Sequence, residues 1–530
     1  MSLVNKDLED RLRPLFRHYK VMFAFTFLCG LFAHSFVFTN IVHNNDNAYA
    51  IPGGYGTGIS SGRWLLEVIR DVFPQFWGGM QNTTAFNGVF SLLILTVCAC
   101  MTARLFSMED KLEGWLWGAV FVCFPTVTSM FFYMYTAPLY SLAILMSVGA
   151  VYVADRYRHG WIAGLLLSGA SMGIYQAFFP LTASLLVLLV LRSVMDREET
   201  IRSLISRALR FAALLVGALA AYLLALKAFL VFYHATLSDY RGINQTARFM
   251  GWRATYEIIK AEYKNFLLLP LQDYMGVTCT RAIRFALIVM AVLTVAALIW
   301  TIIRCGTWLR RLLLLACLAV FPFTVNAILL MCPNAEIYTL MEYALVTVFL
   351  APLTVMARIR LSQEGSVKDR FTHFYLGRGR SLLAAAYVLL ILNYSWLSAV
   401  NYTSMYYTTE QTASFATTLI TQVKSLDGYS PDLPWAFIGK GFKSDDFYSD
   451  WGTSLGVMRL GGNLTSLLNR YSTIRFFQSY TGYHIDYAGD EVVAELMQNE
   501  QVQNMPVYPK DGSIAIVDGV IVIRTRGKLS

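Results

Sequence analysis

About eleven apolar runs follow one another along the first 400 residues of the chain, separated by short polar stretches. A helix of about 20 apolar residues crosses the hydrocarbon core of a membrane, and all but two of these runs approach that length. The pattern therefore predicts a mainly α-helical polytopic membrane protein with about 11 transmembrane helices. The runs lie at 21–39, 85–103, 114–131, 138–154, 161–174, 177–191, 211–233, 282–303, 312–332, 340–357 and 382–400.

The fifth and sixth runs form one uninterrupted apolar stretch, 161–191. We divide it at Tyr175-Gln176-Ala177, because a single span there would move every later basic loop to the opposite side of the membrane. That arrangement would contradict the rule that short cytoplasmic loops are rich in Lys and Arg. The sequence therefore predicts a turn at Tyr175 on the outer side.

The composition agrees with this class, since 56% of the residues are apolar, only 15% are charged and the mean hydropathy is +0.49. A typical soluble domain has about 25% charged residues, so a soluble globular protein is excluded. The net charge of +9 alone would suit a nucleic-acid partner. The positions of the basic residues indicate membrane topology instead.

More than half of the 43 Lys and Arg residues lie in the 1–20 arm and in five short stretches between runs, all on one predicted side. The short loops on the other side contain only Arg63 and Arg70. This positive-inside distribution places the arm 1–20 in the cytoplasm and the segment 401–530 outside. We therefore predict membrane lipids and no nucleic acid as partners.

The N-terminal region has a second interpretation. A charged segment, an apolar run and Ala48-Tyr49-Ala50 resemble a signal peptide with its cleavage site, and cleavage would remove Asp46. The apolar run is longer than a usual signal sequence, and the distance to Ala50 is also long. We therefore expect the first run to remain as a membrane anchor.

Two segments on the outer side have the 3.6-residue period of amphipathic helices. In the segment 63–73, Glu67, Arg70 and Asp71 are expected on a wet face, opposite Trp64, Leu65, Val68, Ile69, Val72 and Phe73. In the segment 249–266, aromatic and aliphatic residues recur every three or four positions. Both helices are expected to lie on the membrane surface or to pack on the protein.

The segment 401–530 has a polar composition and the signals of a small extracytoplasmic α/β domain. Ser513–Val517 and Val520–Arg524 are β-rich and are joined by Asp518-Gly519, a common hairpin turn. Trp435–Ile438 is predicted as a strand and Glu491–Glu500 as a short helix. Three parts are thus predicted: the arm 1–20, a transmembrane catalytic domain 21–400 with outer loops 40–84 and 234–281, and the domain 401–530.

Asp46 lies in the polar run that follows the first apolar run, where the bilayer ends. A carboxylate there is suited to act as a general base that takes a proton from an acceptor hydroxyl. His43 is a weaker candidate base and a candidate substrate-binding residue. A solvated loop or turn position for Asp46 is the structural alternative.

The segment Gly53–Gly58 is rich in glycine and contains Tyr55, but it lacks the pattern of a P-loop. We interpret it as a substrate loop that includes Tyr55, with a plain linker as the alternative. Arg63 begins the following helix, and a guanidinium at the interface is suited to a lipid phosphate. Glu67 is either its i,i+4 partner or a substrate-binding residue.

Further polar residues near the predicted outer side are candidates for the same site. Lys227 and Arg241 are candidate ligands of a donor phosphate, although Lys227 is also placed to snorkel to the headgroups. The candidate substrate-binding residues are Tyr175, Gln176, Asp239 and Glu336, with Tyr240 and Glu342 beside them. A loop or helix-turn position is the structural alternative for each.

Several other kinds of site find no support in the sequence. There is no HExxH, no paired CxxC and no Gly-x-Ser-x-Gly, so metalloprotease, zinc-ribbon and hydrolase functions are not indicated. Most of the eight cysteines lie in apolar runs. A disulfide between Cys279 and Cys332, near the outer side, stays open because sequence does not give their separation.

The beginning of the chain resembles that of a known family. A cytoplasmic arm, one span, Asp46, a glycine-rich loop and then Gly62-Arg63-Trp64-Leu65 are similar to the opening of the type II glucosyltransferases, which modify bacterial surface polysaccharides and convert serotype. The segment Pro506–Ile514 and the hairpin at Asp518-Gly519 are similar to that family's outer tail.

The resemblance implies a GT-C-like membrane fold in the bacterial cytoplasmic (inner) membrane. It also implies a polyprenyl-phosphate sugar as donor, a polysaccharide such as O-antigen or a lipid-linked glycan as acceptor, and transfer at the outer face. It points to Asp46 as the catalytic acidic residue. Where the family often has an Asp-Asp pair, Asn45 and Asn47 flank a lone Asp46, a poor cation site.

We therefore expect a glycosyltransferase without a cofactor, while a divalent metal stays an open question. Two other classes of function remain as alternatives. A lipid-linked glycan flippase or transporter would have charges at mid-membrane and often internal repeats, and the sequence shows few such charges and no repeat. An oligosaccharide polymerase would use similar outer loops and transfer a whole glycan.

Overall fold

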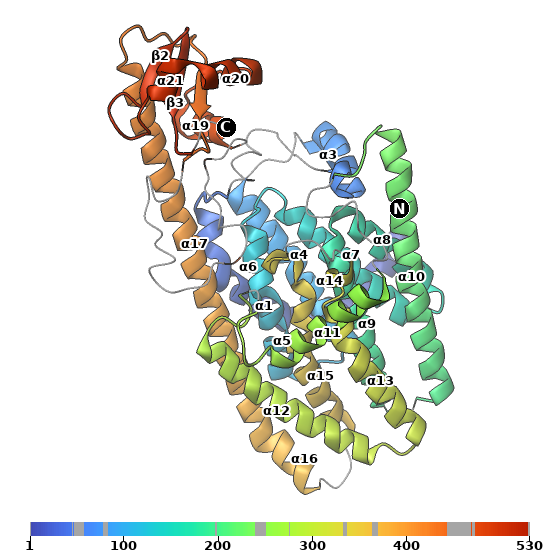
Figure 1. Cartoon of the computed structure of the whole chain (residues 1–530). Helices are drawn as coiled ribbons and strands as arrows, with labels where there is room; N and C mark the ends of the chain where they lie inside the picture. Colours follow the sequence, from blue (N-terminus) through green and yellow to red (C-terminus); the bar gives the residue numbers. More distant parts are fainter. Residues whose placement is uncertain are drawn as a thin grey trace.

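The structure is a computed structural model that describes residues 2–44, 46, 58–77, 83–196, 199–238, 251–274, 276–331, 337–362, 369–442, 460, 468 and 472–527. Side chains are described from Tyr19 onward, except those of residues 73–77. The chain forms a helical bundle, and a small domain lies beyond one end of it (Figure 1).

Nine helical segments of the described chain are long and apolar enough to cross a membrane, as the hydropathy pattern predicts. The chain is therefore a membrane protein. These segments contain α1 (Ser2–Thr39), α4 (Thr84–Leu105), α7 (Ala137–Arg156), α9 (Phe179–Val194), α10 (Ile201–Phe232), α12 (Arg281–Arg304), α13 (Trp308–Val325), α15 (Val346–Ser362) and α17 (Arg380–Lys424).

Two further predicted runs have a different form. The run 114–131 is a pair of helices, α5 (Lys111–Cys123) and α6 (Pro125–Phe131), bent by 41° at Phe124. Pro125 has no backbone N–H to continue the hydrogen bonds of α5, which explains the bend. The run 161–174 is α8 (Gly160–Ile174), a shorter apolar helix. The total of eleven spans therefore stays a prediction.

The predicted turn between the fifth and sixth runs is confirmed. Helix α8 ends at Ile174, Tyr175 has extended backbone angles, and the 3-10 turn η2 (Gln176–Phe178) leads into α9. Pro180 stands in the first turn of α9, where the missing backbone N–H costs nothing.

A buried histidine joins three helices inside the bundle. The two ring nitrogens of His34 in α1 lie 2.8 Å from the Tyr402 hydroxyl of α17 and 2.9 Å from the Val122 carbonyl oxygen of α5. Both partners are distant from His34 in the sequence. A polar side chain at this depth is stable because both of its ring nitrogens have hydrogen-bond partners.

The first amphipathic segment forms α3 (Trp64–Trp77), but one part of the predicted wet face is wrong. Glu67 is only 6% exposed, and Leu66 beside it is also buried. Asp71 and Val72 are exposed. The periodicity therefore predicted the helix correctly. It did not predict that the buried face of the helix includes Leu66 and Glu67.

The second amphipathic segment forms α11 (Trp252–Leu268), which packs against α13 and α14 (Ile328–Met331). Trp252 and Tyr256, from the predicted apolar face, are exposed. The buried position on this helix is Glu262.

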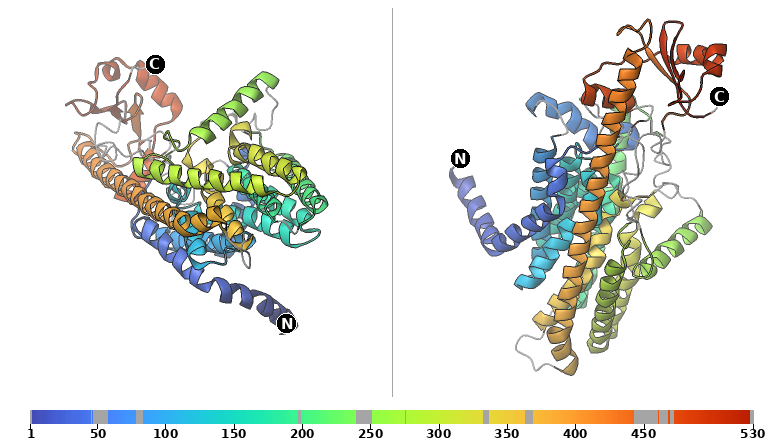
Figure 2. Two further views of the ribbon diagram at one scale, coloured as in Figure 1. Left: turned by 90° about the horizontal axis from the view of Figure 1, so that it is seen from below. Right: turned by 90° about the vertical axis from the view of Figure 1, so that its left-hand side faces the viewer.

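Helix α17 is the longest element of the bundle, and it leads into the C-terminal domain (Figure 2). The predicted boundary at residue 400 falls within this helix, and the division into domains stays a prediction. Near its C-terminal end, Phe415, Leu419 and Val423 pack against the core of the small domain. One rigid element thus leads from the bundle to that domain.

The C-terminal domain contains the predicted strands. A three-stranded sheet has the order β1-β3-β2, with β1 (Trp435–Ile438) parallel and β2 (Ile514–Val517) antiparallel to β3 (Val520–Arg524). Asp518 and Gly519 both have positive φ, as a tight hairpin turn requires. Helices α19 (Thr473–Thr481), α20 (Asp490–Gln498) and α21 (Glu500–Asn504) complete the described part.

Candidate active site

The loop Gly58–Arg63 is bound to the break between α8 and α9. The Gln176 amide nitrogen donates to the Ser61 carbonyl oxygen at 2.8 Å and to the Tyr222 hydroxyl at 3.0 Å. That hydroxyl donates to the Gly62 carbonyl oxygen at 3.0 Å. Gly62 has a φ of 75°, which glycine adopts without strain. These bonds fix the backbone immediately before Arg63.

Arg63 is held against Tyr175, the residue at the predicted turn. The guanidinium carbon lies 4.8 Å from the centre of the Tyr175 ring, and Tyr175 is 2% exposed. A guanidinium over an aromatic face is attracted by the negative charge of the ring's π-system. The structure therefore brings together two residues that the sequence predicted for the site, and Gln176 secures the loop between them.

Tyrosines surround this pair. The Tyr140 ring centre lies 4.9 Å from that of Tyr175. Burial raises the pKa of the Tyr175 phenol, the nearby Tyr338 and Tyr140 act in the same direction, and Arg63 acts against them. The sequence did not single out Tyr133, Tyr140 or Tyr338, because aromatic residues are common throughout the chain.

Asp46 acts electrostatically on the same tyrosine cluster. Its side chain is exposed. Burial raises the pKa of the Tyr133 phenol, and Tyr338, Asp46 and Tyr140 add to this effect. Tyr140 and Tyr338 thus interact with both Tyr133, beside Asp46, and Tyr175, beside Arg63. An acidic residue and a cation therefore border one aromatic cluster, formed by Tyr133, Tyr140, Tyr175 and Tyr338.

Glu67 stabilises the loop Gly58–Arg63 through its carboxylate. Its Oε2 accepts a hydrogen bond from the Ile59 backbone N–H at 3.2 Å, and its other oxygen forms an ion pair with Arg70. A Cβ at Gly58 would lie 1.4 Å from Glu67 Oε2, so a side chain there would displace the Glu67 carboxylate. The described contacts of Glu67 are thus with the chain itself, and a role in substrate binding stays a prediction.

His43 is buried between α17 and α19. Its backbone N–H donates to Thr409 Oγ1 at 3.1 Å, and its ring is edge-on to the Tyr480 and Phe476 rings, with centres 5.3 and 6.4 Å away. Burial lowers its pKa to about 4, so the ring is neutral at physiological pH. It thereby attaches the loop that carries Asp46 to the C-terminal domain.

The structure either does not bring the remaining predicted residues to the Arg63–Tyr175 pair or does not describe them. Lys227 is exposed on α10, whereas Tyr222 and Leu226 of that helix are buried. Its role at a donor phosphate stays a prediction. Cys279 is a free thiol. Tyr55, Asp239, Tyr240, Arg241, Cys332 and Glu336 lie outside the described residues, as do Ala48-Tyr49-Ala50 and the glycines 53–56.

A family model described as glucosyl transferase GtrII matches residues 35–349, more than half of the chain. The chain belongs to this family of type II glucosyltransferases. The match confirms the predicted resemblance and includes Asp46, Arg63, Tyr175 and Tyr338. No curated protein and no solved structure matches the chain.

This glucosyltransferase also has a carboxyl pair, of which the sequence analysis named Glu342 beside the candidate site but did not single out Glu262. Glu262 of α11 and Glu342 before α15 are 0% and 1% exposed, and neither carboxyl oxygen of Glu262 has a hydrogen-bond partner in the described chain. Burial raises the pKa of each to about 8, and the nearby Glu342 adds to the effect on Glu262. The Tyr274 hydroxyl lies beside them. Glu262 lies on the side of the amphipathic helix α11 that faces the protein. That position was the sequence signal from which Glu262 could have been identified.

An apolar groove runs along the glucosyltransferase bundle. It has a volume of about 470 Å³ and is lined almost entirely by aliphatic and aromatic side chains of α9, α11, α12, α13 and α15 and by the turn at Leu269-Pro270. Among the lining residues, Phe266, Leu191 and Ile302 lie near the C-terminal ends of α11, α9 and α12. Several lining residues, including Leu267 and Val295, are exposed, so the groove opens sideways.

The described side chains do not suggest a metal centre. Across the described ranges, no group of three or more His, Cys, Asp or Glu side chains is placed to hold a metal ion. Asp46 is one carboxylate beside tyrosines, a weak set of ligands for a divalent cation. The glucosyltransferase reaction is therefore described below without a metal ion.

Proposed function

We propose that the protein transfers glucose from a polyprenyl-phosphate-linked donor to a hydroxyl of a surface polysaccharide such as O-antigen. The reaction takes place on the outer side of the bacterial inner membrane, in a GT-C-like membrane domain. One observation carries the proposal: Asp46 and Arg63 act electrostatically on the same cluster of tyrosines, of which Tyr133, Tyr140 and Tyr175 are buried. An acid and a cation so placed can act on an acceptor hydroxyl and a donor phosphate together.

Arg63 is the residue that we assign to the donor phosphate. Its planar guanidinium offers a fork of donors that matches phosphate oxygens, and stacking on Tyr175 fixes its orientation. Arg241 and Lys227 are further candidates for the phosphate. The groove supports a lipid-linked donor, because its apolar lining and lateral opening suit a polyprenyl chain that enters from the bilayer.

The chemical step is a displacement at the anomeric carbon. Asp46 accepts the proton of the acceptor hydroxyl while the hydroxyl oxygen forms the new bond to the sugar. The bond between the anomeric carbon and the phosphate oxygen breaks, and polyprenyl phosphate leaves with the electron pair. One displacement inverts the configuration of the sugar, and no nucleotide is consumed.

The C-terminal domain is placed to help with the acceptor. His43, three residues before Asp46, contacts Phe476 and Tyr480 of α19. A glycan that is bound on this domain therefore lies beside the loop with the proposed base. Its location outside the cytoplasm follows from the positive-inside distribution.

Purified protein in lipid vesicles with radiolabelled polyprenyl-phosphate glucose and delipidated surface polysaccharide tests the proposal. We expect label on the polysaccharide and release of polyprenyl phosphate. Movement of the lipid across the bilayer without turnover would instead support a flippase. Activity only with a long lipid-linked glycan as donor would support a polymerase.

A further inference from the structure

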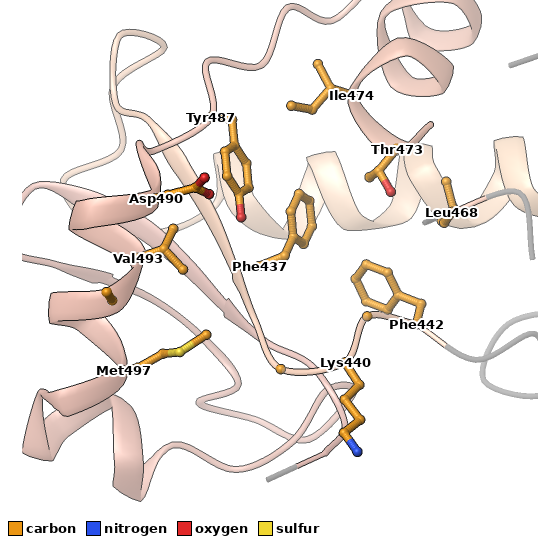
Figure 3. A pocket seen from close by; sticks show the side chains of 13 residues that line it. Phe437, Lys440, Phe442, Leu468, Thr473, Ile474, Tyr487, Asp490, Val493 and Met497 are labelled. Atoms are coloured by element: carbon orange, nitrogen blue, oxygen red, sulfur yellow. The ribbon is translucent and has the colours of Figure 1, made fainter. Parts of the chain in front are cut away.

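A cavity in the C-terminal domain has the properties of a glycan site. Its volume is about 710 Å³, which is within the range of roughly 300–1,000 Å³ typical of small-molecule sites. It lies between the turn after β1, the first residues of α19, and α20 (Figure 3).

Aromatic rings, aliphatic side chains such as Val493 and Met497, and a few polar groups line this cavity. Phe437, Phe442 and Tyr487 contribute rings, and Tyr487 is 37% exposed. Asp490, in the first turn of α20, places an exposed carboxylate near Tyr487 (Figure 3). Lys440 lies apart from Asp490 at another edge, so the described lining residues do not concentrate one charge.

This combination fits the chemistry of a sugar better than that of an anion or a lipid. The C–H face of a pyranose ring packs on the electron-rich face of an aromatic ring, while its hydroxyls donate to a carboxylate. A phosphate would require several cations, and an acyl chain would not benefit from Asp490. The volume is sufficient for a short oligosaccharide segment.

The turn after β1, which lines the cavity, packs closely on the chain after β3. Gly439 has a φ of 130°, and a Cβ there would lie 2.6 Å from the Thr525 carbonyl oxygen. The neighbouring Lys440 backbone N–H donates to the Arg526 carbonyl oxygen at 2.7 Å. The turn is therefore bound to the chain after β3, and one wall of the cavity is held in place.

The cavity and the loop with Asp46 share one short helix. Thr473 and Ile474, at the start of α19, line the cavity, whereas Tyr480 near its end contacts His43. At a rise of about 1.5 Å per residue, Thr473 and Tyr480 are roughly 10 Å apart along the helix axis. A glycan in the cavity is thus a few sugar units from the proposed base.

We infer that this cavity binds the acceptor polysaccharide a few sugars away from the hydroxyl that reacts, and so positions that hydroxyl. The inference rests on the proposed function for the identity of the glycan as acceptor. Tyr487 supplies the stacking surface, and Asp490 accepts hydrogen bonds from sugar hydroxyls.

The experiment uses the full chain in lipid nanodiscs and delipidated surface polysaccharide from the strain that encodes it, cut to one to three repeats. We expect Tyr487→Ala and Asp490→Asn to raise both the Kd and the acceptor KM at least tenfold. The kcat at saturating acceptor and the hydrolysis of polyprenyl-phosphate glucose by water should stay within about twofold, since the reacting groups are unchanged.

Matched controls separate binding from folding. Tyr487→Phe keeps the ring and should bind like the wild type, as should Asp486→Asn, because the Asp486 carboxylate bonds to His484 in solvent. Ala494→Trp blocks the cavity from an exposed position of α20 and should reproduce the loss of binding.

Unchanged Kd and acceptor KM in Tyr487→Ala, Asp490→Asn and Ala494→Trp would overturn the inference. If the wild type neither hydrolyses the donor nor transfers glucose, the proposed function fails. The Kd series still decides in that case whether the cavity binds a glycan.

Discussion

The Arg63 guanidinium carbon lies 4.8 Å from the centre of the buried Tyr175 ring. This contact joins the loop after α1 to the break between α8 and α9, more than a hundred residues later in the chain. A cation over an aromatic ring gains about 0.5–1 kcal/mol at an exposed site and about 2 kcal/mol or more when the contact is desolvated. The contact therefore orients the guanidinium.

We expect Arg63→Lys to raise the KM for polyprenyl-phosphate glucose about tenfold, because the ammonium keeps the charge but loses the stacking and the fork of donors. Steady-state kinetics in vesicles with varied donor measures the effect. Tyr175→Leu should have the same defect, and Tyr175→Phe should not. Arg281→Lys, at an exposed position at the start of α12, is the matched control. A wild-type donor KM in both Arg63→Lys and Tyr175→Leu would contradict the assignment.

Asp46→Asn should lower kcat by about 10²- to 10⁴-fold, the usual contribution of a general base. The donor KM should change little, because Asp46 is assigned to the acceptor hydroxyl. Since the side chain is exposed, the Tm should also stay close to that of the wild type. Asp71→Asn removes another exposed acid that bonds to the Tyr233 hydroxyl, and it should keep most of the activity. Full activity of Asp46→Asn would refute the proposed base.

Gly62→Ala should reduce activity at least tenfold by displacing the loop before Arg63. The residue has a φ of 75°, and a Cβ would lie 2.6 Å from Gln176 Nε2 and 2.7 Å from the Tyr222 hydroxyl. Gly306→Ala is the control, because a Cβ there would meet nothing within 4 Å. Transfer assays and thermal unfolding of both variants test this prediction. Equal activities would mean that docking of the loop is not required.

Glu342→Gln should raise the Tm of the protein at pH 8 to 9 and leave it nearly unchanged at pH 5. Burial raises the pKa of Glu342 and Glu262 to about 8, above the unfolded values, so the protonated forms favour folding. This stabilisation is complete below the unfolded pKa and is lost as the pH rises through about 8. A glutamine removes that loss at high pH.

Thermal unfolding across this pH range measures the effect, and Glu257→Gln provides the control because Glu257 is exposed beside Lys260. The same difference in Tm at pH 5 and pH 9 would show that the carboxyl does not titrate as described. Tyr274 is the other titratable group at this site, and burial raises its pKa far above the tested range.

Ala351→Phe should raise the KM for a donor with a long polyprenyl chain several-fold and leave the KM for a short-chain donor unchanged, because the added ring fills the groove. Kinetics with the two donors tests this prediction. Ala385→Phe, at an exposed position of α17, is the control. An equal effect on both donors would indicate a general disturbance of packing and would remove the groove from the donor site.

The sequence by itself determined the positions of the apolar helices, the break at Tyr175 and the hairpin at Asp518-Gly519. These features depend on hydropathy, on the distribution of charge and on turn chemistry, which act over a few residues or along the membrane normal. The family resemblance could also be recognised from the sequence, because it rests on short motifs of neighbouring residues.

Only the tertiary structure decided which side chains meet. It placed Glu67 and Glu262 on buried faces, joined Arg63 to Tyr175 and attached His43 to α19. In a membrane protein, the lipid tails and the protein interior are similarly apolar, so periodicity cannot tell a lipid-facing side from a protein-facing side. That choice depends on packing between helices that are far apart in the chain.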